Sequence, residues 1–75
     1  MATNLEIHEC DLDEALRVIN AFGSSGQFNA FPVLGGSGVS ELSVYVYEDD
    51  PSKAKEMLSA LLEQNGIASF SLSVA

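Results

Sequence analysis

His8 and Cys10 are the side chains in this sequence that come closest to a catalytic pair. They stand two residues apart in the stretch from Asn4 to Cys10, where apolar and polar residues alternate. In a β-strand this spacing places both side chains on one face, and a thiol beside an imidazole is the minimum for an activated nucleophile. No orienting group or oxyanion donor accompanies them. A small enzyme that works through His8 is therefore only a third hypothesis, after two non-enzymatic ones.

A metal site is the second chemistry to consider. One His and one Cys fall short of the three or four ligands that zinc normally takes. The acidic run Glu48-Asp49-Asp50 could attract a divalent cation, but it lacks the alternating ligand spacing and the glycine of a calcium loop. Its position before Pro51 indicates helix capping instead. We therefore expect neither a metal nor a cofactor.

The segment Gly35-Gly36-Ser37-Gly38 is the third candidate. Its backbone amides could cradle a phosphate, but no Lys or Arg lies nearby and no helix starts directly after it. A flexible hairpin turn is the simpler interpretation, and contact with a ligand is the competing one.

Four stretches that follow the period of two of β-strands must position these residues. Pro32 cannot donate a ladder hydrogen bond, so its strand is expected at a sheet edge. Serines alternate with apolar residues in the last strand and give it a serine-lined outer face. The four expected strands are Asn4 to Cys10, Gln27 to Leu34, Leu42 to Tyr47 and Ala68 to Val74.

Two helices have recognisable ends. Asp11 and Glu14 have the spacing of a capping box, and Gly23 closes the first helix before a loop at Ser24-Ser25-Gly26. Asp50-Pro51 begins the second helix, and Asn65-Gly66 ends it. The apolar stripes expected to face the core are Leu12, Ala15, Leu16, Ile19 and Phe22 in the first helix, and Ala54, Met57, Leu58, Leu61 and Leu62 in the second.

The order β-α-β-β-α-β predicts one α+β domain over residues 1–75, a ferredoxin-like sandwich. Its four-stranded antiparallel sheet has both helices on one face, and the first and third strands are central. We therefore expect His8 near Tyr45 and Tyr47 on the uncovered face. A domain of 75 residues has a thin core, so support from self-association is expected.

The net charge of -8 excludes several classes of partner. Phosphate backbones and anionic membranes repel such a chain, so we expect no binding of nucleic acid or membrane. A single cysteine forms no internal disulfide and fits a reducing compartment. The sequence has no signal peptide and no apolar run of membrane-spanning length, which favours a cytoplasmic protein.

LDEALRVINAF, the glycine-rich loop and ELSVYVYEDDPSKAKEMLSALL together resemble a small prokaryotic family of signal-transducing domains. That family is usually compared with the nitrogen-regulatory fold, and the resemblance covers roughly residues 5 to 63. It implies a regulatory role, with an effector bound at clefts between subunits near the loop Leu34 to Ser40. The family offers no catalytic motif to transfer, and the serine-lined last strand departs from its pattern.

Aromatic residues on the uncovered face give the leading hypothesis. Stacking of RNA on them is disfavoured by the lack of basic residues. We expect a non-enzymatic regulatory or binding module that holds a small ligand, possibly nucleotide-like, or a protein partner on this face and the adjacent glycine-rich loop. We also expect a homodimer or a higher oligomer. The candidate binding residues are Tyr45, Tyr47, His8, Phe31, Gly35, Gly36, Ser37, Gly38 and Ser71.

The second hypothesis is an acidic inhibitor, for example a phage-encoded one. It would block a basic site on a nucleic-acid enzyme or sequester a signalling nucleotide. This function requires a one-sided electric field. Eight acidic residues flank the carboxyl ends of the two central strands, so we expect them to cluster: Glu6, Glu9, Asp11, Asp13, Glu14, Glu48, Asp49 and Asp50.

Overall fold

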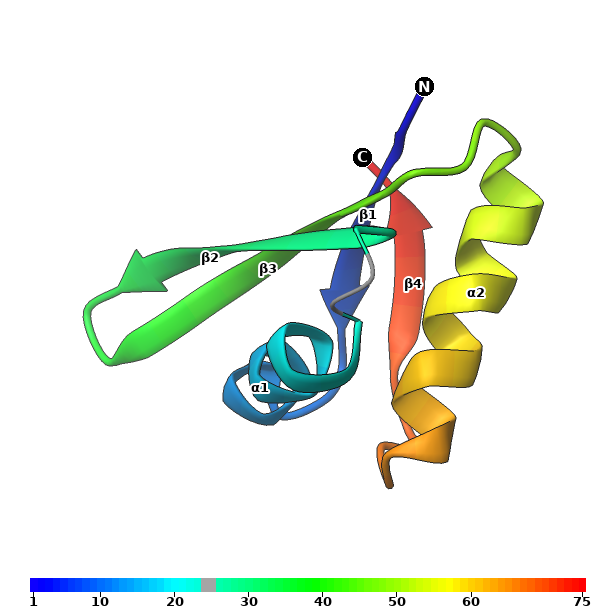
Figure 1. Cartoon of the computed structure of the whole chain (residues 1–75). Coiled ribbons are helices and arrows are strands. Elements are labelled where there is room, and N and C mark those ends of the chain that lie inside the picture. Colours follow the sequence, from blue (N-terminus) through cyan, green and yellow to red (C-terminus); the bar gives the residue numbers. More distant parts are fainter. Residues whose placement is uncertain (24–25) are drawn as a thin grey trace.

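A computed structural model describes residues 1–23 and 26–75, and its elements follow the predicted order (Figure 1). They are β1 (Thr3–His8), α1 (Leu12–Phe22), β2 (Phe28–Gly35), β3 (Gly38–Val46), α2 (Pro51–Gln64) and β4 (Ser71–Val74). The strands form one sheet in the order β2-β3-β1-β4, with every neighbouring pair antiparallel. The ferredoxin-like α+β fold is therefore confirmed. Ser24 and Ser25 of the predicted loop lie outside the described residues.

The helix ends lie where the sequence predicts them. The Asp11 carboxylate accepts hydrogen bonds from the amides of Asp13 and Glu14 at 3.1 and 3.2 Å. The Asp50 carboxylate accepts one from the Ser52 amide at 2.9 Å, and Pro51 occupies the first turn, where its missing amide hydrogen is not needed. These caps satisfy amides that the helices themselves leave unpaired.

One face of the sheet is packed against the helices and forms the core. Val18 joins the core in place of Phe22, whose side chain is 64% exposed although the helical spacing predicts it to be buried. A side chain added at Gly23 would come within 3.0 Å of Phe28 and 3.2 Å of Leu61, so these residues pack closely against the end of α1. The buried apolar residues are Leu5, Ile7, Ala15, Val18, Ile19, Leu42, Val44, Val46, Ala54, Leu58, Leu62 and Ile67.

The hairpin between β2 and β3 is longer than predicted. Gly35 pairs with Gly38, so only Gly36 and Ser37 form the turn. Gly38 has φ 124°, a conformation that side chains strongly disfavour. The expected loop Leu34 to Ser40 is therefore wrong, because strand pairing continues almost to the turn.

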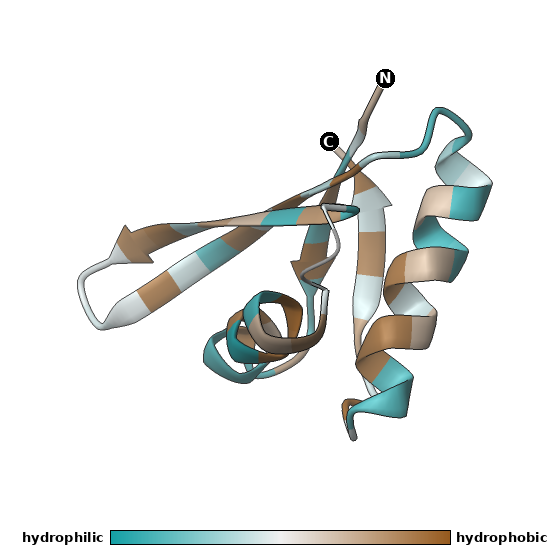
Figure 2. Cartoon of the chain, viewed as in Figure 1, coloured by the Kyte–Doolittle hydropathy of each residue, from teal (hydrophilic) through white to brown (hydrophobic). Residues whose placement is uncertain are grey.

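This hairpin projects past the neighbouring strand β1 (Figure 1). Ile7, the last residue of β1 that pairs with β3, lies opposite Leu42, whereas Val33 and Glu41 pair one step further out. A register shift follows between Val33 and Leu34. We call residues 33–41 the arm; Figure 2 shows apolar segments on both of its strands.

Candidate functional site

The face of the sheet opposite the core is the candidate surface, and we call it the open face. Strand alternation determines its membership, because residues that pair across strands lie on the same face. Its residues are Asn29, Phe31 and Val33 from β2, Glu41, Ser43 and Tyr45 from β3, Asn4, Glu6 and His8 from β1, and Ser71 and Ser73 from β4.

Aromatic and apolar side chains gather on the β2–β3 half of the open face. The rings of Phe31 and Tyr45 meet edge to face, with centroids 5.4 Å apart and an interplanar angle of 83°. They remain 44% and 39% exposed, and Val33 and Tyr47 are 47% and 54% exposed. The Tyr47 amide still donates to the Gln27 carbonyl at 2.9 Å, so pairing and alternation reach Tyr47. Phe31, Val33, Tyr45 and Tyr47 form what we call the aromatic patch.

The β1–β4 half of the open face is polar. The Ser43 hydroxyl donates to Asn4 Oδ1 at 2.7 Å, and Ser73 Oγ lies 3.0 Å from His8 Nε2. Glu6 Oε1 lies 3.6 Å from the same His8 nitrogen. A catalytic triad needs the nucleophile and the acid on different imidazole nitrogens. This Ser-His-Glu group therefore lacks the geometry of a triad.

His8 does not lie beside Tyr45, although both are on the open face. Tyr45 pairs with Asn4, which is four residues before His8 in β1. At about 3.3 Å per residue this separation is roughly 13 Å. The expected proximity of His8 to Tyr45 and Tyr47 is therefore wrong, because antiparallel pairing brings the start of β1 to the end of β3.

Cys10 does not share a face with His8 either. Glu9 has φ 62°, which breaks the strand alternation, and Cys10 packs against the hydrophobic core. Burial, and then the charges of Asp11 and Glu14, raise the pKa of the Cys10 thiol above its ordinary value. A raised pKa lowers the thiolate fraction at neutral pH. The structure therefore separates the two members of the expected nucleophile pair.

The glycine-rich turn is also distant from the aromatic patch. Gly38 and Tyr45 are seven residues apart on β3, which corresponds to roughly 23 Å along an extended strand. The structure thus brings Phe31 and Tyr45 together, with Tyr47 two residues further along the chain, but places His8 and Ser71 on the polar half and the glycines at the tip of the arm. The sequence-based list also omits Ser73, whose alternation with Ser71 was visible in the sequence.

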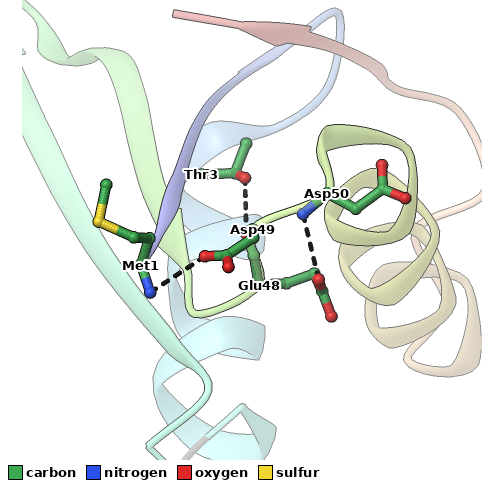
Figure 3. A network of polar contacts seen from close by, with 5 residues as sticks. All are labelled: Met1, Thr3, Glu48, Asp49 and Asp50. Carbon is green, nitrogen blue, oxygen red and sulfur yellow. Dashed lines mark hydrogen bonds and ion pairs between the residues drawn. The ribbon is translucent and has the colours of Figure 1, made fainter.

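Seven of the eight acidic residues divide into two groups, and the eighth, Glu6, lies in the middle of β1. Glu48, Asp49 and Asp50 lie beside the start of β1, where Thr3 Oγ1 donates to the Glu48 carbonyl at 2.6 Å (Figure 3). The Met1 amino group lies 3.0 Å from Asp49, and the Asp50 amide donates to the Glu48 side chain. Residues 9–14 follow the other end of β1. The expected single cluster is wrong, because antiparallel strands have their carboxyl ends at opposite edges.

Within residues 1–23 and 26–75 the structure shows neither a pocket nor a group of three metal-ligating side chains. None of the helices described is long and apolar enough to cross a membrane. Comparisons with protein-family models, curated proteins and solved structures give no match. The resemblance to signal-transducing domains accordingly stays a prediction.

Proposed function

We propose that this protein is a non-enzymatic binding module that holds a protein partner on its aromatic patch. The observation that supports this proposal is the edge-to-face pair of Phe31 and Tyr45, which is 44% and 39% exposed on the open face. Aromatic side chains are enriched at protein interfaces and supply much of their binding energy. A pair fixed by mutual contact loses less side-chain entropy when a partner binds it.

The surroundings of the patch support a protein surface rather than a small molecule as its occupant. Small-molecule sites are concave, whereas these rings stand on the surface of a sheet. Next to them, Asn4 and Ser43 form a polar margin whose hydrogen bond is already made. An apolar centre with a polar margin is the usual arrangement of a protein interface. In this proposal the module acts by binding its partner and covering part of the partner's surface.

Affinity measurements on variants of the patch test the function. The wild-type protein serves as bait in an extract of its source organism, and each captured protein is then purified and titrated by calorimetry. Tyr45→Ala should raise Kd about 30-fold, as expected for an aromatic hot spot worth about 2 kcal/mol.

Two controls accompany this titration. Phe22→Ala removes an aromatic side chain that is more exposed than Tyr45 but lies outside the patch, and Cys10→Ser changes a residue that packs against the core. Both should leave Kd unchanged. The same Kd for Tyr45→Ala and wild type would refute the proposed site.

A further inference from the structure

Charge is absent from a long part of this acidic chain. Eleven Asp and Glu residues accompany three Lys and Arg, yet no charged residue stands between Arg17 and Glu41. This interval includes all of β2 and the first residues of β3. Of the eight large apolar side chains that the described residues leave exposed, five lie on β2, on β3 or directly after β3: Phe31, Val33, Leu34, Tyr45 and Tyr47.

From this distribution we infer that the occupant of the aromatic patch is a second copy of this chain, packed face to face about a two-fold axis. The inference rests on the proposed function and names its partner. Two molecules with a charge of -8 repel each other. They can therefore approach most closely where charge is least dense, and on the β2–β3 half of the open face Glu41, which pairs with Val33, is the one charged residue. Glu48 directly follows Tyr47 at one end of the patch, whereas residues 9–14 follow the other end of β1.

Packing through the face is favoured over strand addition at the edge of β2. The bond from the Tyr47 amide to the Gln27 carbonyl fixes which residues of β2 point their backbone groups toward β3. By alternation, the backbone of Pro32 points away from β3, toward the side on which an added strand would pair. Proline has no amide hydrogen to donate there, so it disfavours the addition of another strand at this edge.

A dimer interface of standard size would cover a substantial part of this small chain. A standard interface buries about 800 Å² on each partner, and the chain has 4384 Å² of accessible surface. An interface of standard size would therefore take roughly a fifth of the surface. The patch alone is too small for this area, so the contact must extend to neighbouring residues of the open face such as Asn29 and Ser43.

Sedimentation velocity over a range of concentrations tests the inference. The wild type should be a dimer, and Tyr45→Glu should raise the dimer dissociation constant at least about 100-fold, because it buries an unpaired charge. Phe22→Glu should remain a dimer, since Phe22 lies outside the face. Circular dichroism must show a folded Tyr45→Glu variant. A wild-type monomer at high concentration would overturn the inference.

The edge of β4 is the competing place for a dimer, and a second variant addresses it. The Ala75 amide donates to the Asn4 carbonyl at 3.0 Å, so by alternation the amides of Leu72 and Val74 point outward. Val74→Pro removes one outward donor and should leave the dimer intact. A dimer lost in Val74→Pro but kept in Tyr45→Glu would overturn face-to-face packing.

Cross-linking provides a readout that does not depend on a disruptive variant. In a Cys10→Ala background, Ser43→Cys places a thiol directly opposite Phe31, and Ser71→Cys places one on the polar half. Near a two-fold axis a thiol meets its own copy within disulfide distance. Ser43→Cys should therefore form a covalent dimer under oxidation and Ser71→Cys should not. The reverse result would overturn the assignment.

These outcomes separate the inference from the proposed function. A monomeric wild type that binds a captured protein, with binding lost in Tyr45→Ala, overturns the second-copy inference and keeps the binding module. A dimer that dissociates in Tyr45→Glu supports the inference whether or not another protein is captured.

Discussion

Neighbouring residues of the same strands build two very different surfaces. In β1, Leu5 and Ile7 are 0% and 1% exposed and contact the core, while Glu6 and His8 between and beyond them reach solvent. In β3 the same alternation separates buried Val44 from Tyr45, which is 39% exposed. The alternation of side chains thus places the apolar contacts that stabilise the fold on one face of the sheet and leaves the other face available for recognition.

The open face itself differs from one half to the other. On the β1–β4 half, polar side chains contact each other, as in the pairs Asn4–Ser43 and His8–Ser73. On the β2–β3 half, Phe31 and Tyr45 contact each other but keep apolar surface in water. Exposed apolar surface that is concentrated in one place is typical of an interface. Strand alternation alone therefore does not define a binding site, because the register of strand pairing determines which half of the open face a residue belongs to.

Substitutions of adjacent β1 residues should give the largest difference between the two faces. Leu5→Ala removes a fully buried side chain and should cost about 2–5 kcal/mol of unfolding free energy. Asn4→Ala removes one hydrogen bond with Ser43 and should cost about 1 kcal/mol. Urea unfolding measures both values. Equal losses would contradict the assignment of the core to one face.

A double-mutant cycle sharpens the description of the apolar half. Phe31→Ala, Tyr45→Ala and the double variant should give a coupling free energy of about 0.5–1.5 kcal/mol, the range for edge-to-face pairs. Unfolding is measured at concentrations where each variant is monomeric, so that dimer dissociation does not contribute. Zero coupling would show that the rings do not form the pair in solution.

The smallest effect is expected on the polar half. His8→Ala removes contacts with Ser73 and Glu6 that are exposed to water, and it should change the unfolding free energy by less than about 0.5 kcal/mol. Chemical denaturation of His8→Ala and Ser73→Ala tests this. If either variant lost as much unfolding free energy as Asn4→Ala, the polar half would also contribute to the stability of the fold.

Local chemistry made most of the fold predictable. Asp11 and Asp50 have side chains that cap helix starts without long-range information, and the structure confirms both starts. The alternation in β3 likewise predicted which of its residues face the core. These features depend on spacing within one segment, which the sequence shows directly.

The errors concern relations between segments. Glu9 adopts a positive φ that its residue type does not indicate, and this turn separates Cys10 from His8. Phe22 is exposed and Val18 is buried, although the helical spacing places Phe22 in the apolar stripe. The distance between His8 and Tyr45 depends on strand register. The separation of the two acidic groups, by contrast, could be predicted from the sequence, because it follows from the predicted antiparallel order of the strands. The expectation that these residues cluster did not take that order into account.

The central place of β1 has a consequence for the order of folding. Its partner β4 is at the far end of the chain, with His8 opposite Ser71 and Leu5 opposite Val74. The β2–β3 hairpin, by contrast, closes over a two-residue turn, and hairpins form within about 1–10 μs. During synthesis β1 emerges before β4 and has an unpaired edge until residues 71–74 leave the ribosome. Completion of the sheet therefore requires the contacts with the highest loop-closure entropy in the fold, and these are the contacts that slow folding.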